Sequence, residues 1–138
     1  MRVFLFAGLL TLATGGVGFA ASCEQNFKSD GVPLVTSVSY RSTQSFTGVK
    51  SAAALQRLAQ AIAAEGFSGI KVNKQLASIE AFQETTGSGR IQTLRVTARA
   101  QGKSTRVDAI FTIQAGQATS KSVVREGLCR IIASAAVV

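Results

Sequence analysis

The chain has 138 residues, of which 46% are hydrophobic and 16% are charged. This balance is typical of a single packed domain and excludes a disordered polymer, since such chains bury too little apolar surface to offset the entropy of ordering. Lysine and arginine outnumber the acidic residues by 15 to 7, and the net charge of +8 favours anionic partners without identifying one.

The first 22 residues have the order of a secretory signal peptide. Met1 and Arg2 are a short basic start, residues 3–12 are strongly apolar, and small residues follow up to a plausible cleavage point after Ala20. An uncleaved anchor is the alternative, but the apolar run is about half of the ~20 residues that a membrane span requires. We therefore expect a periplasmic or secreted domain, which keeps a formal excess of seven positive charges once Arg2 is removed.

Two cysteines, Cys23 and Cys129, allow two interpretations. In an oxidising compartment we expect a disulfide between them. It would close a loop of ~100 residues, for which chain entropy estimates about 4 to 5 kcal/mol of stabilisation. Alternatively, residues 20–23 (AASC) fit a permissive lipobox, in which Cys23 becomes the lipid-modified first residue and anchors the protein to a membrane. Cys129 would then be left unpaired.

The next part of the chain combines a tether and a first strand. Residues 23–31 lack any periodicity and are predicted to be an N-terminal tether, so that residues 32–138 form a single domain. From Val32 onward, alternation predicts a half-buried strand with Leu34, Val38 and Tyr40 on its apolar side. The polar stretch after Arg41, residues 42–50, is predicted to be a connection.

Two amphipathic helices are predicted. Ser51 is a suitable N-cap for the first, Leu55, Leu58 and Ile62 share its apolar stripe, and Gly66 ends it. The second is predicted to begin after Ser120, with an apolar stripe made of Val124, Leu128, Ile131, Ile132 and Ala135.

Four further strands are predicted between the helices. A short extended piece covers residues 69–72, and an alternating strand covers 76–86, followed by a turn at residues 87–89. A four-residue turn there would place Glu80 beside Arg95.

A hairpin is predicted around Gly102 and Lys103, in a type II′ turn with glycine first. This register pairs apolar residues on one face, such as Val96 with Ala109. On the other face it places Arg99 directly opposite Arg106.

The predicted fold is an α+β two-layer sandwich. An antiparallel sheet of about four strands carries two helices on one face, in the order β-α-β-β-β-β-α with one short strand. The second face of the sheet is left open to solvent or to a partner.

Candidate binding residues lie on this open face. Asp108 is diagonal to Arg95 and Arg99 and is expected to offset part of the charge. The residues expected to contact a partner are the basic Arg99, Lys103 and Arg106 near the hairpin tip and the apolar Phe82 and Ile110. The alternative for the apolar pair is that the tail or the tether covers them.

Motifs for catalysis, metals and cofactors are few. The chain has no histidine, which excludes histidine-dependent triads, and its two cysteines cannot complete a structural zinc site. The GKS sequence at 102–104 is preceded by Thr97 where a phosphate-binding loop needs glycine. Ser68 and Lys71 have the serine–x–x–lysine spacing of penicillin-recognising enzymes, without the companion motifs. No cofactor is expected.

The leading hypothesis is a non-enzymatic, exported binding or accessory module of the cell envelope, which contacts an anionic or protein partner through the open sheet face. Nucleic acid is not expected as a partner, because export separates the chain from it. Two alternatives are a proteinaceous inhibitor of a secreted enzyme and a small hydrolase that uses Ser68 and Lys71.

Overall fold

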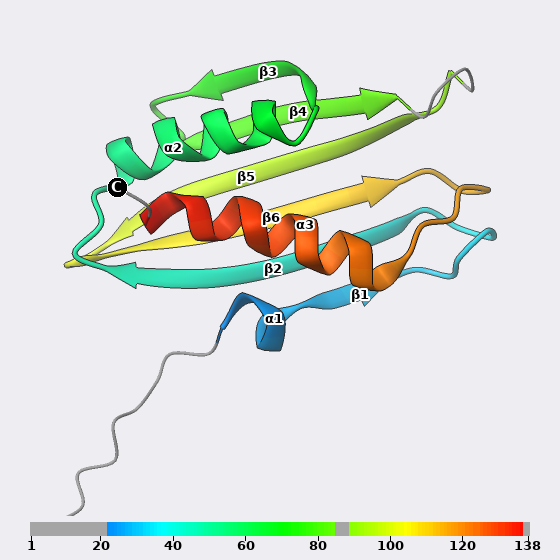
Figure 1. The fold of residues 1–138 in the computed structure, drawn as a ribbon, viewed down its shortest axis with the longest axis horizontal. Helices are drawn as coiled ribbons and strands as arrows, with labels where there is room; N and C mark the ends of the chain where they lie inside the picture. Colours follow the sequence, from blue (N-terminus) through cyan, green and yellow to red (C-terminus); the bar gives the residue numbers. More distant parts are fainter. Residues whose placement is uncertain (1–21, 85–88, 137–138) are drawn as a thin grey trace, which may run out of the picture.

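The computed structural model describes residues 22–84 and 89–136 and shows an α+β fold, as predicted (Figure 1). The elements along the chain are α1 (Cys23–Asn26), β1 (Lys28–Asp30), β2 (Val38–Thr47), α2 (Ser51–Ala64), β3 (Ser68–Asn73), β4 (Ser78–Glu84), β5 (Ile91–Gln101), β6 (Ser104–Ile113), α3 (Lys121–Ala133) and the short 3-10 helix η1 (Ser134–Ala136). The signal-peptide prediction and most of the predicted turn at residues 87–89 lie outside the described residues.

The six strands form one antiparallel sheet in the order β1-β2-β6-β5-β4-β3. The helices α2 and α3 lie side by side over the same face of this sheet, α2 toward β3, β4 and β5 and α3 toward β2 and β6 (Figure 1). The opposite face carries neither of these helices, which confirms the predicted two-layer arrangement.

The predicted count of about four strands is wrong, because the sheet has six. The segment expected to be a tether forms α1 and β1, and β1 adds to the edge of the sheet by pairing Lys28 with Arg41 and Asp30 with Ser39 of β2. The expected short piece at 69–72 is a six-residue edge strand, β3. Both edge strands are held by backbone hydrogen bonds to a neighbouring strand. Such pairing leaves no periodic pattern of apolar side chains, so the sequence did not reveal it.

The first long strand is displaced from its predicted position. The backbone N–H groups of Val35 and Thr36 both donate to the carbonyl of Val32, so residues 32–36 form a turn in which Leu34 is exposed with φ of 69°. The strand β2 instead begins at Val38 and continues through the stretch predicted to be a polar connection. Pairing with β6 along its whole length holds this polar half of β2 in the sheet.

The helix ends confirm two of the three predicted caps. Gly66, with φ of 92°, ends α2 in a Schellman motif in which its N–H donates to the Ala63 carbonyl. Ser120 caps α3 by accepting a hydrogen bond from the Val123 N–H. Ser51 is not the N-cap of α2, because it lies inside the helix and its hydroxyl donates to the Ala98 carbonyl of β5.

The hairpin register between β5 and β6 is confirmed residue by residue, with Val96 opposite Ala109 and Arg99 opposite Arg106. Gly102 has φ of 58°, as the first central position of a type II′ turn requires. The apolar side of this register faces the helices and is buried together with Leu58 of α2, except at Ala100 beside the turn, which is exposed. The core therefore lies between the sheet and the two helices.

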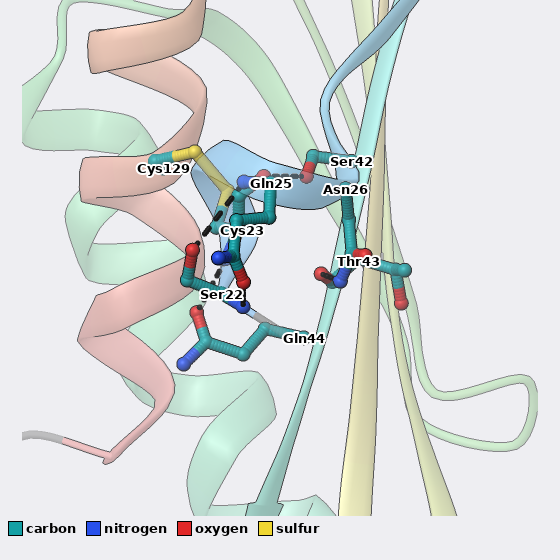
Figure 2. The surroundings of a disulfide bond; sticks show 8 residues. All are labelled: Ser22, Cys23, Gln25, Asn26, Ser42, Thr43, Gln44 and Cys129. Atoms are coloured by element: carbon teal, nitrogen blue, oxygen red, sulfur yellow. Dashed lines mark hydrogen bonds between the residues drawn. A yellow bond between two sulfur atoms is a disulfide. The ribbon is translucent and has the colours of Figure 1, made fainter. Parts of the chain in front are cut away.

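The predicted disulfide is present and fastens the N-terminus to the helix layer. Cys23 of α1 is bonded to Cys129 of α3, 106 residues away in the sequence, and both cysteines are buried. Around this bond, the Ser42 hydroxyl donates to the Cys23 carbonyl and the Asn26 side chain donates to the Thr43 carbonyl, so that β2 also holds α1 (Figure 2). The bond occupies the sulfur that lipid modification of Cys23 would need.

Among residues 22–84 and 89–136, none of the helices has the length and apolar character needed to cross a bilayer.

Candidate functional site

The open sheet face presents aligned rows of side chains from all six strands. The middle row consists, from one edge to the other, of Lys28, Arg41, Ile110, Arg95, Glu80 and Lys71. Because side chains alternate between the two faces of a strand, the residues two positions away on each strand form the neighbouring rows of the same face. Charged and apolar residues thus meet on this face at fixed spacings.

One half of this face is hollowed and basic. A depression of about 500 Å³ is lined by side chains from β1, β2, β5 and β6. We call it the basic hollow; its ionisable residues are Lys28, Arg41, Arg99, Arg106 and Asp108. Four cations against one carboxylate leave a formal excess of three positive charges.

Among the residues that the structure describes, Arg106 is the one cation of the basic hollow that forms an ion pair. The Nε atom of Arg106 lies 3.2 Å from Oδ1 of Asp108, two residues along the same strand. The expectation that Asp108 offsets Arg95 and Arg99 is therefore wrong. Arg99 faces Arg106 across the ladder without an ion pair of its own, and in the described residues Arg41 has none either.

The other half of the face contains a second depression, of about 470 Å³, over β3, β4, β5 and β6. We call it the apolar hollow; its exposed apolar side chains are Phe82, Ile91 and Ile110. Arg95 lies between these residues and donates to Glu80 at 2.6 Å, which confirms the predicted pair and neutralises the charge of that arginine.

Phe82 has a packing role that the sequence did not reveal. Its ring lies against Gly69 of β3 so closely that a Cβ atom at residue 69 would be 2.1 Å from a ring carbon. Gly69 belongs to a bulge between Ser68 and Lys71, and its φ of 60° suits glycine. The tether does not cover Phe82, because β1 lies at the opposite edge of the sheet from β3 and β4.

Lys103 is the one predicted binding residue that lies apart from both hollows. It is at the tip of the β5–β6 hairpin, where its carbonyl accepts a hydrogen bond from the Gly48 N–H at 2.8 Å. It borders a separate depression together with residues that connect β2 to α2. The structure therefore groups Arg99, Arg106 and Ile110 in one hollow and places Phe82 with Ile110 in the other.

Lys28 and Arg41 belong to the basic hollow but were not among the predicted site residues. The parity of the first strand already placed Arg41 on its polar side. Its place in the same hollow as the hairpin arginines depends on the pairing of β2 with β6, in which Arg41 lies opposite Ile110, 69 residues away in the sequence. Lys28 was missed because it lies in the segment expected to be a tether.

Ser68 and Lys71 are placed on the edge strand β3, on either side of the bulge. Ser68 is opposite Phe82, and Lys71 is opposite Glu80. No hydrogen bond joins Ser68 to Lys71 in the described part of the chain. Within the same residues there is also no group of three or more potential metal ligands.

No protein-family model matches the sequence, and no curated protein matches it either.

Proposed function

We propose that this protein is an exported, non-enzymatic binding module that holds an anionic partner against its open sheet face. The observation that carries the proposal is the basic hollow, in which four cations from four strands surround a single carboxylate. Lys28 and Arg41 lie at one end of this hollow, and Arg99 and Arg106 lie four residues farther along the ladder, so a partner with several anionic groups would contact both pairs.

The arrangement of the arginines supports this proposal on energetic grounds. Like charges directly opposite each other in an antiparallel ladder are destabilising, and Arg99 and Arg106 occupy such positions. Asp108 is the acidic neighbour within reach, and it contacts Arg106. A bound anion would relieve the remaining repulsion and would gain charge-assisted hydrogen bonds, each worth roughly 1.5 to 3 kcal/mol. Arginine suits this role because its planar guanidinium can bind phosphate, sulfate or carboxylate groups through two parallel hydrogen bonds.

The disulfide supports the export part of the proposal. Disulfides persist in oxidising compartments and are rare in the reducing cytoplasm. The bond between Cys23 and Cys129 is consistent with a non-cytoplasmic protein. An anionic component of the cell envelope is therefore the partner that we propose.

The test is binding to immobilised heparin, a sulfated polysaccharide that serves as a general polyanion. Reversing the charge of Arg99 and Arg106 together (R99E and R106E) removes two of the cations and introduces repulsion. We expect binding to weaken by at least tenfold, because each lost charge-assisted contact is worth roughly 1.5 kcal/mol or more.

The matched control is the double variant K121E and R125E. Lys121 and Arg125 are exposed on α3, so this variant has the same net charge but an intact open face. It should elute from heparin close to the wild-type protein. Equal weakening in both variants would show that only the net charge matters, and that outcome would contradict the proposal. Circular dichroism of both variants confirms that the fold is retained.

A further inference from the structure

We infer that the ligand of the open face is an amphiphile that carries an anionic group beside an aliphatic chain, as an alkyl phosphate or a lysophospholipid does. This inference rests on the proposed function and names the chemistry of its partner. Its basis is the direct contact between the basic hollow and the apolar hollow.

Ile110 joins the two hollows, because its side chain lines both of them. Directly opposite Ile110 on β2 is Arg41, a cation of the basic hollow. Neighbouring strands lie about 4.8 Å apart. A ligand whose charged group reaches Arg41 therefore has its next atoms over Ile110.

Beyond Ile110, the apolar hollow offers a continuous surface along which the aliphatic chain of the ligand could lie. Thr93 and Thr112 are paired across β5 and β6 one row farther along, and both line the hollow. Ile91 and Phe82 are adjacent to Thr93 on this face. The exposed fractions of the three large apolar residues are 40% for Phe82, 42% for Ile91 and 37% for Ile110, so each has surface that a bound chain would remove from water.

The path that the aliphatic chain of the ligand would follow carries little net charge. Of the charged residues that line the apolar hollow, Arg95 is paired with Glu80, so it does not compete with the basic hollow for the anionic group. Lys71 lies on the edge strand β3, beyond Glu80 and away from the path over Ile110, Thr93 and Ile91. The volumes of the two hollows, about 470 and 500 Å³, each fall within the range of roughly 300 to 1,000 Å³ that is usual for small-molecule sites. A simple anion would occupy only the basic hollow and leave the exposed apolar residues uncovered.

The experiment is a calorimetric titration of the full mature chain with inorganic phosphate, butyl phosphate, hexyl phosphate and octyl phosphate, each below its micelle concentration. Inorganic phosphate reports the anionic group alone. We expect the affinity to rise by about two- to fourfold for each added methylene, which corresponds to partial to complete burial of that group.

Two variants test where the alkyl chain of the ligand lies on the open face. I110T and I91T remove apolar contacts but keep β-branched residues that suit a strand. Both should reduce the gain in affinity per methylene, and I91T, whose residue lies outside the basic hollow, should leave the affinity for inorganic phosphate unchanged. R41Q should instead weaken every member of the series by a similar factor. The matched control is V123T, which changes an exposed valine on α3, on the helix side of the sheet, and should alter nothing.

The outcomes separate this inference from the proposed function. Two results would overturn the amphiphile assignment and leave the proposed function standing. One is an affinity that does not depend on the length of the alkyl chain. The other is a gain in affinity per methylene that persists in both I110T and I91T. Such a result would favour an acidic protein segment or a polysaccharide. Failure of the whole series, together with failure to bind heparin, would overturn the proposed function itself.

Discussion

At the scale of single residues, Gly69 and Phe82 depend on each other. The ring of Phe82 covers the backbone of Gly69, and the contact fixes the edge strand β3 against β4. Phe82 thus has a structural reason to lie on a solvent-facing surface, in addition to the exposed ring surface that borders the apolar hollow. This pair allows the structural role of the ring to be measured separately from any role in binding.

We expect G69A to destabilise the protein by roughly 1 to 3 kcal/mol, since the new methyl group overlaps the ring and φ is positive at that residue. In the double variant G69A and F82A the overlap is removed, so the combined loss should be smaller than the sum of the single losses. Urea denaturation of the four proteins measures this coupling. Additive losses would show that the ring does not pack on β3.

At the scale of secondary-structure elements, an ion pair joins the ends of the two helices. Arg130 in the last turn of α3 donates from two guanidinium nitrogens to the two carboxylate oxygens of Glu65, at 2.6 and 3.0 Å. Glu65 is the C-cap residue of α2. The hydrogen bond from Arg130 lowers the pKa of Glu65 below its usual value of 4.5, and partial burial opposes this effect without cancelling it.

This pKa shift predicts how E65Q affects stability as pH changes. A carboxyl group whose pKa is lower in the folded state stabilises the fold above its unfolded pKa, and that contribution disappears as pH falls through the folded value. Wild type should therefore exceed E65Q in unfolding free energy by a small, constant amount at neutral pH, and the difference should shrink below pH 4.5. Thermal melts of both proteins across the acidic range provide the measurement. A difference that grows on acidification would contradict the ion pair.

The elements that sequence predicted well are those with internal periodicity. The helix α2, the helix α3 and the β5–β6 hairpin each repeat apolar residues at the spacing of their own geometry, and each was found with its buried face correct. The strand β1 has three residues, all exposed, so it has no pattern to detect. It forms because the edge of β2 is available for backbone pairing, and the sequence of residues 28–30 alone does not indicate this.

At the scale of the whole molecule, the strand order decides which residues share a site. Sequence placed Arg99 opposite Arg106, since a hairpin fixes its own register. It could not place Arg41 in the same hollow, because β2 pairs with β6 only after the chain has passed through a helix and three other strands. The pair Arg99 and Arg106, which comes from the local hairpin, was therefore predicted. Lys28 and Arg41, which join the hollow through pairing between distant segments, were not.

The disulfide acts on the same scale, since it links the two ends of the domain. A bond that spans 106 residues restricts the unfolded chain, and loop entropy estimates its contribution at about 4 to 5 kcal/mol, with measured values often lower. In the folded protein it also holds α1, which leads directly into β1 and Lys28 of the basic hollow. Loss of the bond should therefore affect both stability and the edge of the site.

We expect the double variant C23A and C129A to lose about 2 to 5 kcal/mol of unfolding free energy in urea. Reduction of the wild-type protein should give a similar loss. Hydrogen exchange should accelerate in α1 and β1 well before the central strands, because without the disulfide they are held at the edge of the sheet mainly by hydrogen bonds to β2 and by the packing of Phe27 on Tyr40. Intact mass of the unreduced wild-type protein provides the independent check: a chain that carries lipid on Cys23 would leave Cys129 as a free thiol and would contradict the disulfide.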